Sequence, residues 1–218
     1  MPVIMMTREL RNYDAAAASW DTNPYRVRLA EDVCRAIGER VRLRPDMDVL
    51  EVGCGTGLLT LLLRPQVRSI TGIDSSKGML GVLEERIREQ GVTGVTTRLM
   101  DLEAPDPWEG RYDLIVSSMT LHHIRNVPRL LHLCSSALKP GGTLAVADLD
   151  TEGGMFHRKT ELVYHNGFDR AILAKEFLDA GLHKVRNRTA AMPVKPDGNG
   201  ELRCFTVFLM TGEKPGEE

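Results

Sequence analysis

The sequence predicts an α/β fold in which a mostly parallel sheet is covered by helices on both faces. Short apolar runs typical of buried strands alternate along the chain with segments whose apolar residues recur at helical spacing. A glycine-rich turn stands between the first such strand and the helix that follows it. Strands that alternate with helices indicate parallel pairing, because a helical crossover is the usual connection between parallel strands.

Length and composition limit the class of protein. The chain has 218 residues, of which 42% are hydrophobic and 27% charged, as in an ordinary folded domain rather than a disordered chain. Its 28 basic and 30 acidic residues give a formal net charge of −2, so no excess of positive charge favours a nucleic-acid backbone. We therefore expect one globular domain that binds no nucleic acid.

Targeting and redox signals favour the cytoplasm. The longest apolar run, residues 58–63 with Thr60 inside it, is far shorter than the ~20 residues of a membrane-spanning helix. Residues 1–6 lack the features of a signal peptide. The four cysteines are far apart and form no C-x-x-C pair, which fits reduced thiols better than disulfides or a zinc site. These cysteines are Cys34, Cys54, Cys134 and Cys204.

A helix is expected to precede the alternation. Asn23 and Pro24 form a typical helix start, with a capping side chain followed by proline in the first turn. Apolar residues then recur at every fourth position, so one face of this helix should pack on the sheet. They are Leu29, Val33, Ile37 and Val41.

Five strands and three further helices follow up to residue 148. Short apolar runs mark the strands, and apolar periodicity with capping residues marks the helices. In chain order we expect a strand at 47–52, a helix at 58–63 that Pro65 ends, a strand at 69–73, a helix from about 76 that ends at Gly91, strands at 95–100 and 112–117, a helix from Asn126 through Leu138 that Pro140 and two glycines end, and a strand at 143–148.

The last third of the chain begins with an irregular stretch at 151–167. A helix is expected from 169 to 180, because Gly181 stands in the favoured position just past its end. Two late strands are expected near 184–191 and 202–211.

Three alternating glycines, Gly53, Gly55 and Gly57, occupy the first turn from strand to helix. Ligands of parallel sheets bind at the carboxyl ends of the strands, where glycine lets the backbone approach a ligand or adopt positive φ. The pattern favours ligand binding over a turn that needs glycine for its geometry alone. It is not a P-loop, because no lysine follows, and it departs from G-x-G-x-x-G, because the third glycine comes one position early.

Asp74 closes the second strand, about 21 residues after Gly53. A carboxylate at this place can accept hydrogen bonds from ribose hydroxyls. The alternative is a carboxylate that only caps the following helix. Its distance from the glycine turn favours the ribose role and so indicates a ligand that contains adenosine.

Five ordered motifs resemble those of the class I S-adenosylmethionine-dependent methyltransferases. They are 49–57 (VLEVGCGTG), 72–74 (GID), 101–103 (DLE), 112–116 (YDLIV) and 138–144 (LKPGGTL). A looser similarity continues through 167–169 and 178–181, with Leu182 where phenylalanine is usual. The resemblance implies a Rossmann-like, doubly wound sheet of seven strands with the last strand antiparallel, and S-adenosylmethionine as the cofactor.

The resemblance also implies which residues hold the cofactor. The glycine turn flanks its methionyl part and ribose, and Glu51 orders that turn from below. Asp74 holds the ribose hydroxyls, while Asp101 accepts from the adenine amino group; a solvated loop acid is the alternative for Asp101. The implied set is Glu51, Gly53, Gly55, Gly57, Asp74, Ser75, Met79, Asp101, Leu102 and the backbone near Ser117.

Four of the six histidines fall where the fold opens its pocket. His122 and His123 follow the fourth strand, and His157 and His165 lie in the stretch after the fifth. A histidine suits the removal of a proton from an acceptor, because its pKa of about 6.5 lies near the working pH. We name His123 and His165 as candidate bases, with packing or loop roles as the alternative. Their spacing predicts no metal site.

The remaining pocket residues are expected from three segments. Tyr13 and Trp20 precede the first strand, in a segment that folds over the pocket in similar proteins; Trp20 shields the site or only anchors the leading helix. Asp148 ends the fifth strand and either orients the substrate or caps its loop. Phe156 and His157 offer acceptor contacts from the stretch at 151–167, which topology delivers to the pocket, and His122 offers them from the turn after the fourth strand.

These expectations give a domain organisation and a function. Residues 1–45 form a helical lid segment, 46–212 the cofactor-binding domain and 213–218 a frayed tail. We expect methyl transfer from S-adenosylmethionine to a small-molecule acceptor, because no large insertion serves macromolecular recognition. The alternatives are a protein that binds the cofactor without transfer and, with less support, a nicotinamide-dependent oxidoreductase.

Overall fold

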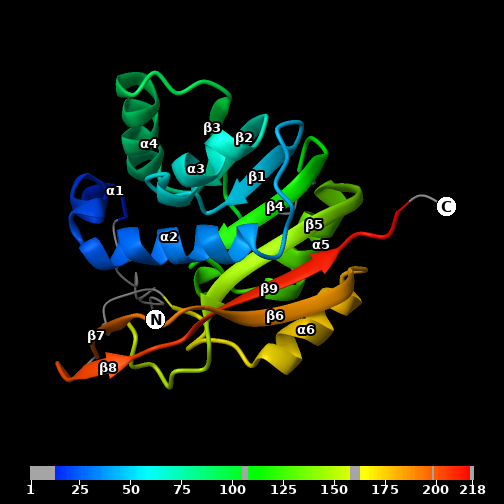
Figure 1. Cartoon of the computed structure of the whole chain (residues 1–218). Helices are drawn as coiled ribbons and strands as arrows, with labels where there is room; N and C mark the ends of the chain where they lie inside the picture. Colours follow the sequence, from blue (N-terminus) through cyan, green and yellow to red (C-terminus); the bar gives the residue numbers. More distant parts are fainter. Residues whose placement is uncertain (1–12, 105–107, 158–162, 198, 217–218) are drawn as a thin grey trace, which may run out of the picture.

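One mixed sheet forms the centre of the molecule in this computed structural model, which describes residues 13–104, 108–157, 163–197 and 199–216. Its strands are β1 (Asp48–Val52), β2 (Ser69–Asp74), β3 (Val95–Leu99), β4 (Tyr112–Ser118), β5 (Leu138–Leu149), β6 (His183–Ala191) and β9 (Val207–Glu213). They lie in the order β3-β2-β1-β4-β5-β9-β6, as Figure 1 shows. The order turns back at β1 and β4, so the carboxyl ends of these two strands open a crevice at which ligands bind in such sheets.

The expected strand directions are confirmed. β1 pairs in parallel with β2 and β4, β2 with β3, and β4 with β5. β9 runs antiparallel to both β5 and β6. The fold is therefore a Rossmann-like α/β sheet of seven strands with its last strand antiparallel.

Helices cover both faces of the sheet, as expected. They are α1 (Tyr13–Ala16), α2 (Pro24–Gly38), α3 (Leu58–Leu63), α4 (Lys77–Glu89), α5 (Val127–Ala137) and α6 (Arg170–Asp179), with three 3-10 turns, η1 (Ala17–Thr22), η2 (Arg64–Gln66) and η3 (Leu121–His123). One apolar core joins α2 and α3 to the sheet, and a second joins α5 and α6 to the opposite face. Side chains at Asn23, Ser76, Asn126 and Asp169 accept backbone hydrogen bonds at the starts of α2, α4, α5 and α6.

Three expected boundaries differ from the structure. The strand expected at 202–211 is two strands, because β8 (Leu202–Cys204) is exposed and pairs with β7 (Val194–Pro196) in a separate two-stranded arm, whereas β9 is buried in the main sheet. The helix expected through Leu138 ends at Ala137, and Leu138 begins β5. Lys214, expected in the frayed tail, exchanges backbone hydrogen bonds with Gly141 and Gly142.

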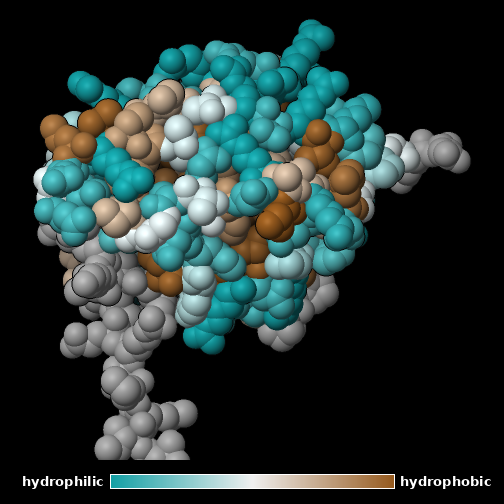
Figure 2. All heavy atoms as spheres, turned by 90° about the horizontal axis from the view of Figure 1, so that it is seen from below, coloured by the Kyte–Doolittle hydropathy of each residue, from teal (hydrophilic) through white to brown (hydrophobic). Residues whose placement is uncertain are grey.

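The molecular surface carries single apolar side chains among charged ones. Seen from below, hydrophobic groups are separated by hydrophilic ones (Figure 2). The most exposed large apolar residues include Ile172 and Leu178 on α6 and Leu202 on the arm. Within the described ranges, none of the helices is long and apolar enough to span a membrane.

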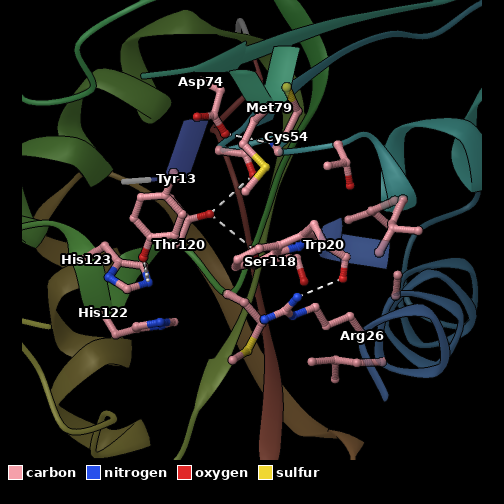
Figure 3. A pocket seen from close by; sticks show the side chains of 18 of the residues that line it. Tyr13, Trp20, Arg26, Cys54, Asp74, Met79, Ser118, Thr120, His122 and His123 are labelled. Carbon is pink, nitrogen blue, oxygen red and sulfur yellow. Dashed lines mark hydrogen bonds between the residues drawn. The ribbon is translucent and has the colours of Figure 1, made fainter. Parts of the chain in front are cut away.

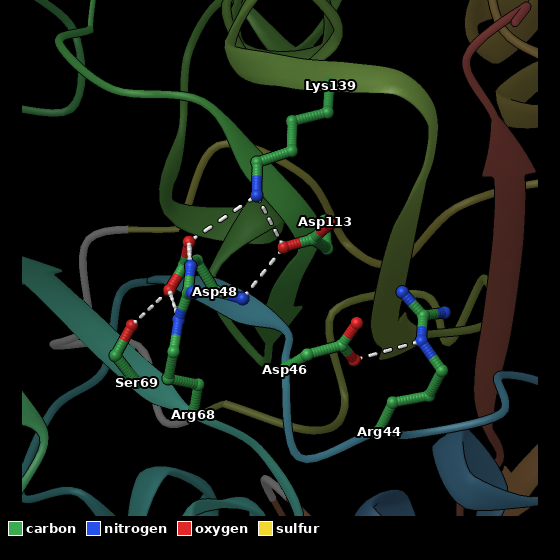
Figure 4. A network of polar contacts seen from close by, with 7 residues as sticks. All are labelled: Arg44, Asp46, Asp48, Arg68, Ser69, Asp113 and Lys139. Carbon is green, nitrogen blue, oxygen red and sulfur yellow. Dashed lines mark hydrogen bonds and ion pairs between the residues drawn. The ribbon is translucent and has the colours of Figure 1, made fainter.

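A polar network joins four strands at the amino edge of the sheet, opposite the crevice (Figure 4). Lys139 in β5 donates to Asp113 in β4 at 2.7 Å and to Asp48 in β1 at 3.4 Å. Arg68 and Ser69, at the start of β2, donate to Asp48 as well. Chiefly through Arg68, the pKa of Asp48 falls below its ordinary value. Burial acts to raise the pKa of Asp113, but Lys139 outweighs it and leaves this pKa lowered too.

Replacing Lys139 tests this network. Both carboxylates have a lower pKa in the folded chain than unfolded, so their stabilisation is full above about pH 4 and is lost as pH falls below it. We expect Lys139→Met to lower the free energy of unfolding by about 1 kcal/mol at pH 7, because the pair is partly exposed. The deficit should shrink below pH 4 in urea unfolding. Arg44→Met, which breaks an exposed pair with Asp46, is the control and should change little; a Lys139 deficit that persists at pH 2.5 would contradict the account.

Candidate active site

The glycine turn between β1 and α3 has the backbone conformation that its sequence predicts. Gly53, Gly55 and Gly57 have φ of 73°, 54° and 82°. A Cβ on Gly53 would lie 2.2 Å from the Thr120 hydroxyl, and one on Gly57 would lie 2.2 Å from a Leu83 methyl group. Gly55 has open space on that side. Gly53 and Gly55 line the cavity described below, whereas Gly57 begins α3 and packs against α4.

Asp74 links the end of β2 to this turn. Its carboxylate accepts from the Gly55 amide at 2.8 Å and from the Ser76 amide at 2.9 Å. Burial raises the pKa of Asp74, and these hydrogen bonds counteract part of the rise. The Ser76 hydroxyl, which accepts from the Met79 amide, caps α4. Asp74 is therefore not the helix cap, and it also lines the cavity.

Glu51 lies beneath the turn, with only 2% of its surface exposed. Its carboxyl group accepts from the Thr60 hydroxyl at 2.5 Å. Burial raises the pKa of Glu51 to about 8, although the hydrogen bond from Thr60 acts in the opposite direction. At pH 7 the side chain is therefore mainly neutral and can donate as well as accept a hydrogen bond.

The residues expected around adenine all line one cavity. Met79 and Leu102 are buried and supply apolar walls, while Ser75 and Asp101 are exposed at the rim. Asp101 accepts from the Glu103 amide at 2.9 Å and so shapes its own loop. All four line the same cavity as Asp74.

Ser117, like Gly57, is a cofactor candidate that does not line the cavity. Its hydroxyl is buried and donates to the Val52 carbonyl at 3.0 Å, which joins β4 to β1. The next two residues, Ser118 and Met119, line the cavity instead. Successive residues of a strand face opposite ways, so a shift of one position exchanges the two sides of the sheet.

The covering segment, residues 13–22 of α1 and η1, lies over the cavity and is held by carboxylates. Asp14 accepts from the Ser76 hydroxyl and the Gly78 amide, each at 2.6 Å. Asp21 accepts from the Thr56 hydroxyl at 2.8 Å and pairs with Arg86. These contacts join the segment to the start of α4 and to the glycine turn. Residues 1–12 of the expected lid lie outside the described residues.

Aromatic rings of the covering segment face into the site. The Tyr13 hydroxyl lies 3.0 Å from Nε2 of His123, and its ring is 5.9 Å from that of Trp20. The Arg26 guanidinium stacks 3.6 Å from the Trp20 ring. Figure 3 shows Tyr13 between Asp74 on one side and the two histidines of η3 on the other.

Three imidazoles, those of His122, His123 and His157, form a cluster in the cavity. The His122 ring centre lies 4.1 Å from that of His123 and 4.7 Å from that of His157. Nδ1 of His122 lies 2.7 Å from the Asp148 carboxylate. Phe156, 4.9 Å from the His157 ring, continues the wall. We call His122, His123, His157 and Phe156 the acceptor wall.

His165 lies outside this wall. Its Nε2 bonds to the Ile124 carbonyl at 2.8 Å, and its ring packs on Phe168. It does not line the cavity among the described residues, so we do not carry its candidate role as a base forward. Its neighbour Tyr164 does not line the cavity either, and the Arg125 guanidinium lies over its ring.

Several lining residues escaped the sequence analysis. Thr120 fixes the Gly53 turn by steric contact, and Tyr25 lies at the start of α2 with a buried hydroxyl that has no hydrogen-bond partner in the described chain. Burial raises the pKa of Tyr25. β7 of the arm brings Val194 and Lys195 to the cavity, and the Lys195 ammonium lies 3.9 Å from the Phe156 ring centre. Only the proline-led start of α2 offered a local signal for any of them.

The glycine turn, Asp74, the residues expected around adenine, the rings of the covering segment and the acceptor wall share one cavity of about 780 Å³ at the carboxyl ends of the strands. The volume is at the upper end of ordinary ligand sites and leaves room for a nucleoside cofactor and a small acceptor. No group of three or more His, Cys, Asp or Glu side chains in the described ranges has the arrangement of a metal site.

Comparison with known proteins decides the family. Residues 25–188 match the family model described as a methyltransferase domain. The chain belongs to the methyltransferase family. This match covers most of the chain, and it identifies a class I enzyme fold whose cofactor is S-adenosylmethionine.

Individual relatives of this methyltransferase are distant. A ubiquinone biosynthesis O-methyltransferase from Methylococcus capsulatus is 35% identical over 102 residues, which are 46% of this chain and 43% of that protein. The chain spans about half the length of the curated relatives it matches.

Solved structures share its fold. A putative methyltransferase in complex with the Haloferax volcanii Trm112 activator has a TM-score of 0.74 at 19% identity, covering 93% of this chain and 97% of that one. A Haemonchus contortus phosphoethanolamine N-methyltransferase, solved with S-adenosylmethionine, has a TM-score of 0.68 at 15% identity, covering 84% and 52%.

The role predicted for Asp74 can be tested by ligand affinity. We expect Asp74→Asn to weaken binding of S-adenosylhomocysteine about 10- to 100-fold, the loss of about 1.5–3 kcal/mol typical of hydrogen bonds to a charged group. Isothermal titration calorimetry measures it, with Asp32→Asn on the surface of α2 as the control. Unchanged affinity together with a lowered melting temperature would leave Asp74 a structural role only.

The raised pKa of Glu51 predicts a pH-dependent stability. Its ordinary pKa is about 4.3, so between pH 4.3 and 8 the folded chain retains a proton that the unfolded chain has released, and rising pH destabilises the fold. Glu51→Gln cannot ionise and should lose less stability than the wild type between pH 5 and 8.5 in urea unfolding. Glu31→Gln, at an exposed site on α2, should follow the wild type. Parallel curves for wild type and Glu51→Gln would refute the assignment.

Proposed function

We propose that this methyltransferase transfers the methyl group of S-adenosylmethionine to a small-molecule acceptor bound against the acceptor wall. One observation carries the proposal: the groups suited to the cofactor and a wall of imidazole and aromatic rings line the same covered cavity. Bound there, the cofactor supplies a methyl group activated by a positively charged sulfur.

The residues present fit this cofactor. Gly55 has positive φ and no atom within 4 Å of the place where a Cβ would stand, so the backbone can lie directly against a ligand. Asp74 would hold the ribose hydroxyls, and Met79, Leu102, Ser75 and Asp101 would enclose the adenine. The glycine turn, ordered by Glu51 from below and by Asp74 from the side, would hold the methionyl part.

The chain itself contributes positioning and exclusion of water. Methyl transfer is an in-line displacement, which proceeds fastest when the acceptor atom is held about 3–3.5 Å from the methyl carbon in a dry site. The covering segment, with Tyr13 and Trp20, would shield the reacting atoms. The imidazole cluster would orient the acceptor and receive its proton, with His123 held by Tyr13.

A small acceptor is favoured over a macromolecule by the covered cavity. The segment at 13–22 is joined to both the glycine turn and α4, which leaves little room for a protein or nucleic-acid chain. A cytoplasmic location agrees with the four free cysteines. Because the covering segment precedes β1 and lies against the cavity, we treat residues 1–45 as the lid and 46–212 as the catalytic domain.

Radiolabel transfer tests the proposal. The chain is incubated with methyl-labelled S-adenosylmethionine and a cell extract that has been split into small molecules and macromolecules, after calorimetry with S-adenosylhomocysteine and NAD. We expect binding of S-adenosylhomocysteine, no binding of NAD, and label in the small-molecule fraction. Binding without transfer would favour a cofactor-binding protein, and label in macromolecules would refute the acceptor class.

The acceptor wall predicts a selective kinetic effect of Phe156. Phe156→Leu should lower kcat/KM for the identified acceptor about tenfold, because the wall loses its ring, while affinity for S-adenosylhomocysteine stays within twofold. Phe177→Leu removes a buried ring in α6 far from the cavity and is the matched control for lost stability. An equal fall in kcat/KM in both variants would mean that Phe156 acts only through the fold.

A further inference from the structure

A buried pair of a histidine and a carboxylate, joined by a hydrogen bond, stands at the carboxyl ends of β4 and β5, and packing alone does not explain it. Asp148 lies near the end of β5 and His122 lies in η3, just after β4, with 0% and 1% of their surfaces exposed. Burying a carboxylate costs several kcal/mol unless it is well paired, and apolar residues of similar volume are often as stable. A buried pair of this kind at the ligand edge of the sheet therefore indicates a chemical role.

The hydrogen bonds fix the protonation pattern of the His122 ring. Asp148 accepts from Nδ1 of His122 and from the Leu149 amide, each at 2.7 Å. Burial acts to raise the pKa of Asp148, but its pairing with His122 and the hydrogen bonds it accepts keep this pKa lowered. An ionised carboxylate only accepts, so Nδ1 carries a hydrogen, and in the neutral ring Nε2 then keeps its lone pair.

The lone pair of Nε2 is available on the cavity side. His122 lines the cavity, and its Nε2 makes no hydrogen bond with the part of the chain that the structure describes. The amide groups of Tyr164 and His165 donate to the His122 carbonyl at 2.9 and 3.3 Å, so its backbone is also held. The ring is thus fixed at both ends, as a group that takes a proton must be.

The charges around the ring select the kind of acceptor. His123 and His157 contact the ring, and Lys195 lies beside Phe156, which adjoins His157. Arg26 lines the same cavity, and the carboxylates of Asp74, Asp101 and Glu103 line it on the side of the glycine turn and the loop after β3. The carboxylate of Asp197, which also lines it, accepts from the amides of Asn199 and Glu201 in its own turn. A positively charged ammonium acceptor would meet like charge here, whereas a hydroxyl that becomes an anion would be stabilised.

We propose that His122 is the general base of the reaction, that Asp148 is its positioning residue, and that the acceptor is a phenol or enol. The proton of the acceptor O–H passes to Nε2. The oxygen forms a bond to the methyl carbon while the carbon–sulfur bond of the cofactor breaks and leaves its electron pair on sulfur. The imidazolium formed beside Asp148 then returns the proton to water. This inference rests on the proposed function.

The tautomer can be measured without knowing the acceptor. Nitrogen-15 NMR of histidine-labelled protein, with His122 assigned from the spectrum of His122→Asn, should show hydrogen on Nδ1 and a bare Nε2 in the neutral ring. Asparagine can still donate to Asp148, so this variant keeps the buried carboxylate paired. If the neutral His122 ring of the folded wild-type protein carries its hydrogen on Nε2, the proposal is overturned.

Kinetics with two phenols of similar size test the proton transfer. At pH 8, 4-nitrophenol is already ionised, while 4-methylphenol is not, having a pKa of about 10 like tyrosine. We expect His122→Asn to lower kcat/KM by 10²- to 10⁴-fold for 4-methylphenol, the usual range for a lost general base, and less than tenfold for 4-nitrophenol. Asp148→Asn should give the same selectivity with about a 10- to 100-fold loss.

Controls separate catalysis from folding. Affinity for S-adenosylhomocysteine should stay within twofold in both variants, and His132→Asn, on an exposed part of α5, should leave both rates unchanged. Equal losses for the two phenols would overturn the role of His122 as a base. Transfer to amines but to neither phenol would overturn the acceptor class while the proposed function stands. Transfer to no acceptor at all would instead remove the proposed function, and this inference with it.

Discussion

The hydrogen bond from the Gly55 amide to Asp74 is the contact on which the rest of the site depends. It joins the end of β2 to the turn after β1 and so fixes the backbone of that turn. Gly53 then lies against Thr120, which leaves no room for a Cβ and sets where the chain goes after β4. η3, which carries His122 and His123, begins at the next residue, so these two histidines are held at a fixed distance from the glycine turn by backbone and steric contacts.

Two carboxylates of the covering segment, those of Asp14 and Asp21, join it to the glycine turn and to α4. Asp14 binds the start of α4 and Asp21 binds Thr56 in the glycine turn, so the segment rests on elements that Asp74 already orders. Tyr13 reaches from there to His123. The amino edge of the sheet, held by Lys139, remains independent of these contacts.

Sequence reasoning succeeded where a signal is local and failed where it depends on packing between loops. The glycines and Asp74 have a fixed spacing and a fixed place in a parallel sheet, so their meeting at one edge could be predicted. The backbone near Ser117 was named for the cofactor; the Ser117 side chain faces into the sheet, and the next residues, Ser118 and Met119, line the cavity. His165 and the arm were misjudged because no periodicity reports how the chain folds after β5. The pairing of His122 with Asp148 joins two separate motifs, which no single pattern contains.

The central claim is that one cavity holds the cofactor beside the imidazole cluster. A crystal structure of the chain with S-adenosylhomocysteine tests it most directly. The account predicts ribose oxygens within about 2.6–3.2 Å of the Asp74 carboxylate, adenine between Met79 and Leu102, and the sulfur directed toward His122 and Tyr13. A nucleoside bound elsewhere, or a sulfur directed away from the imidazole cluster with the acceptor wall out of reach, would contradict it.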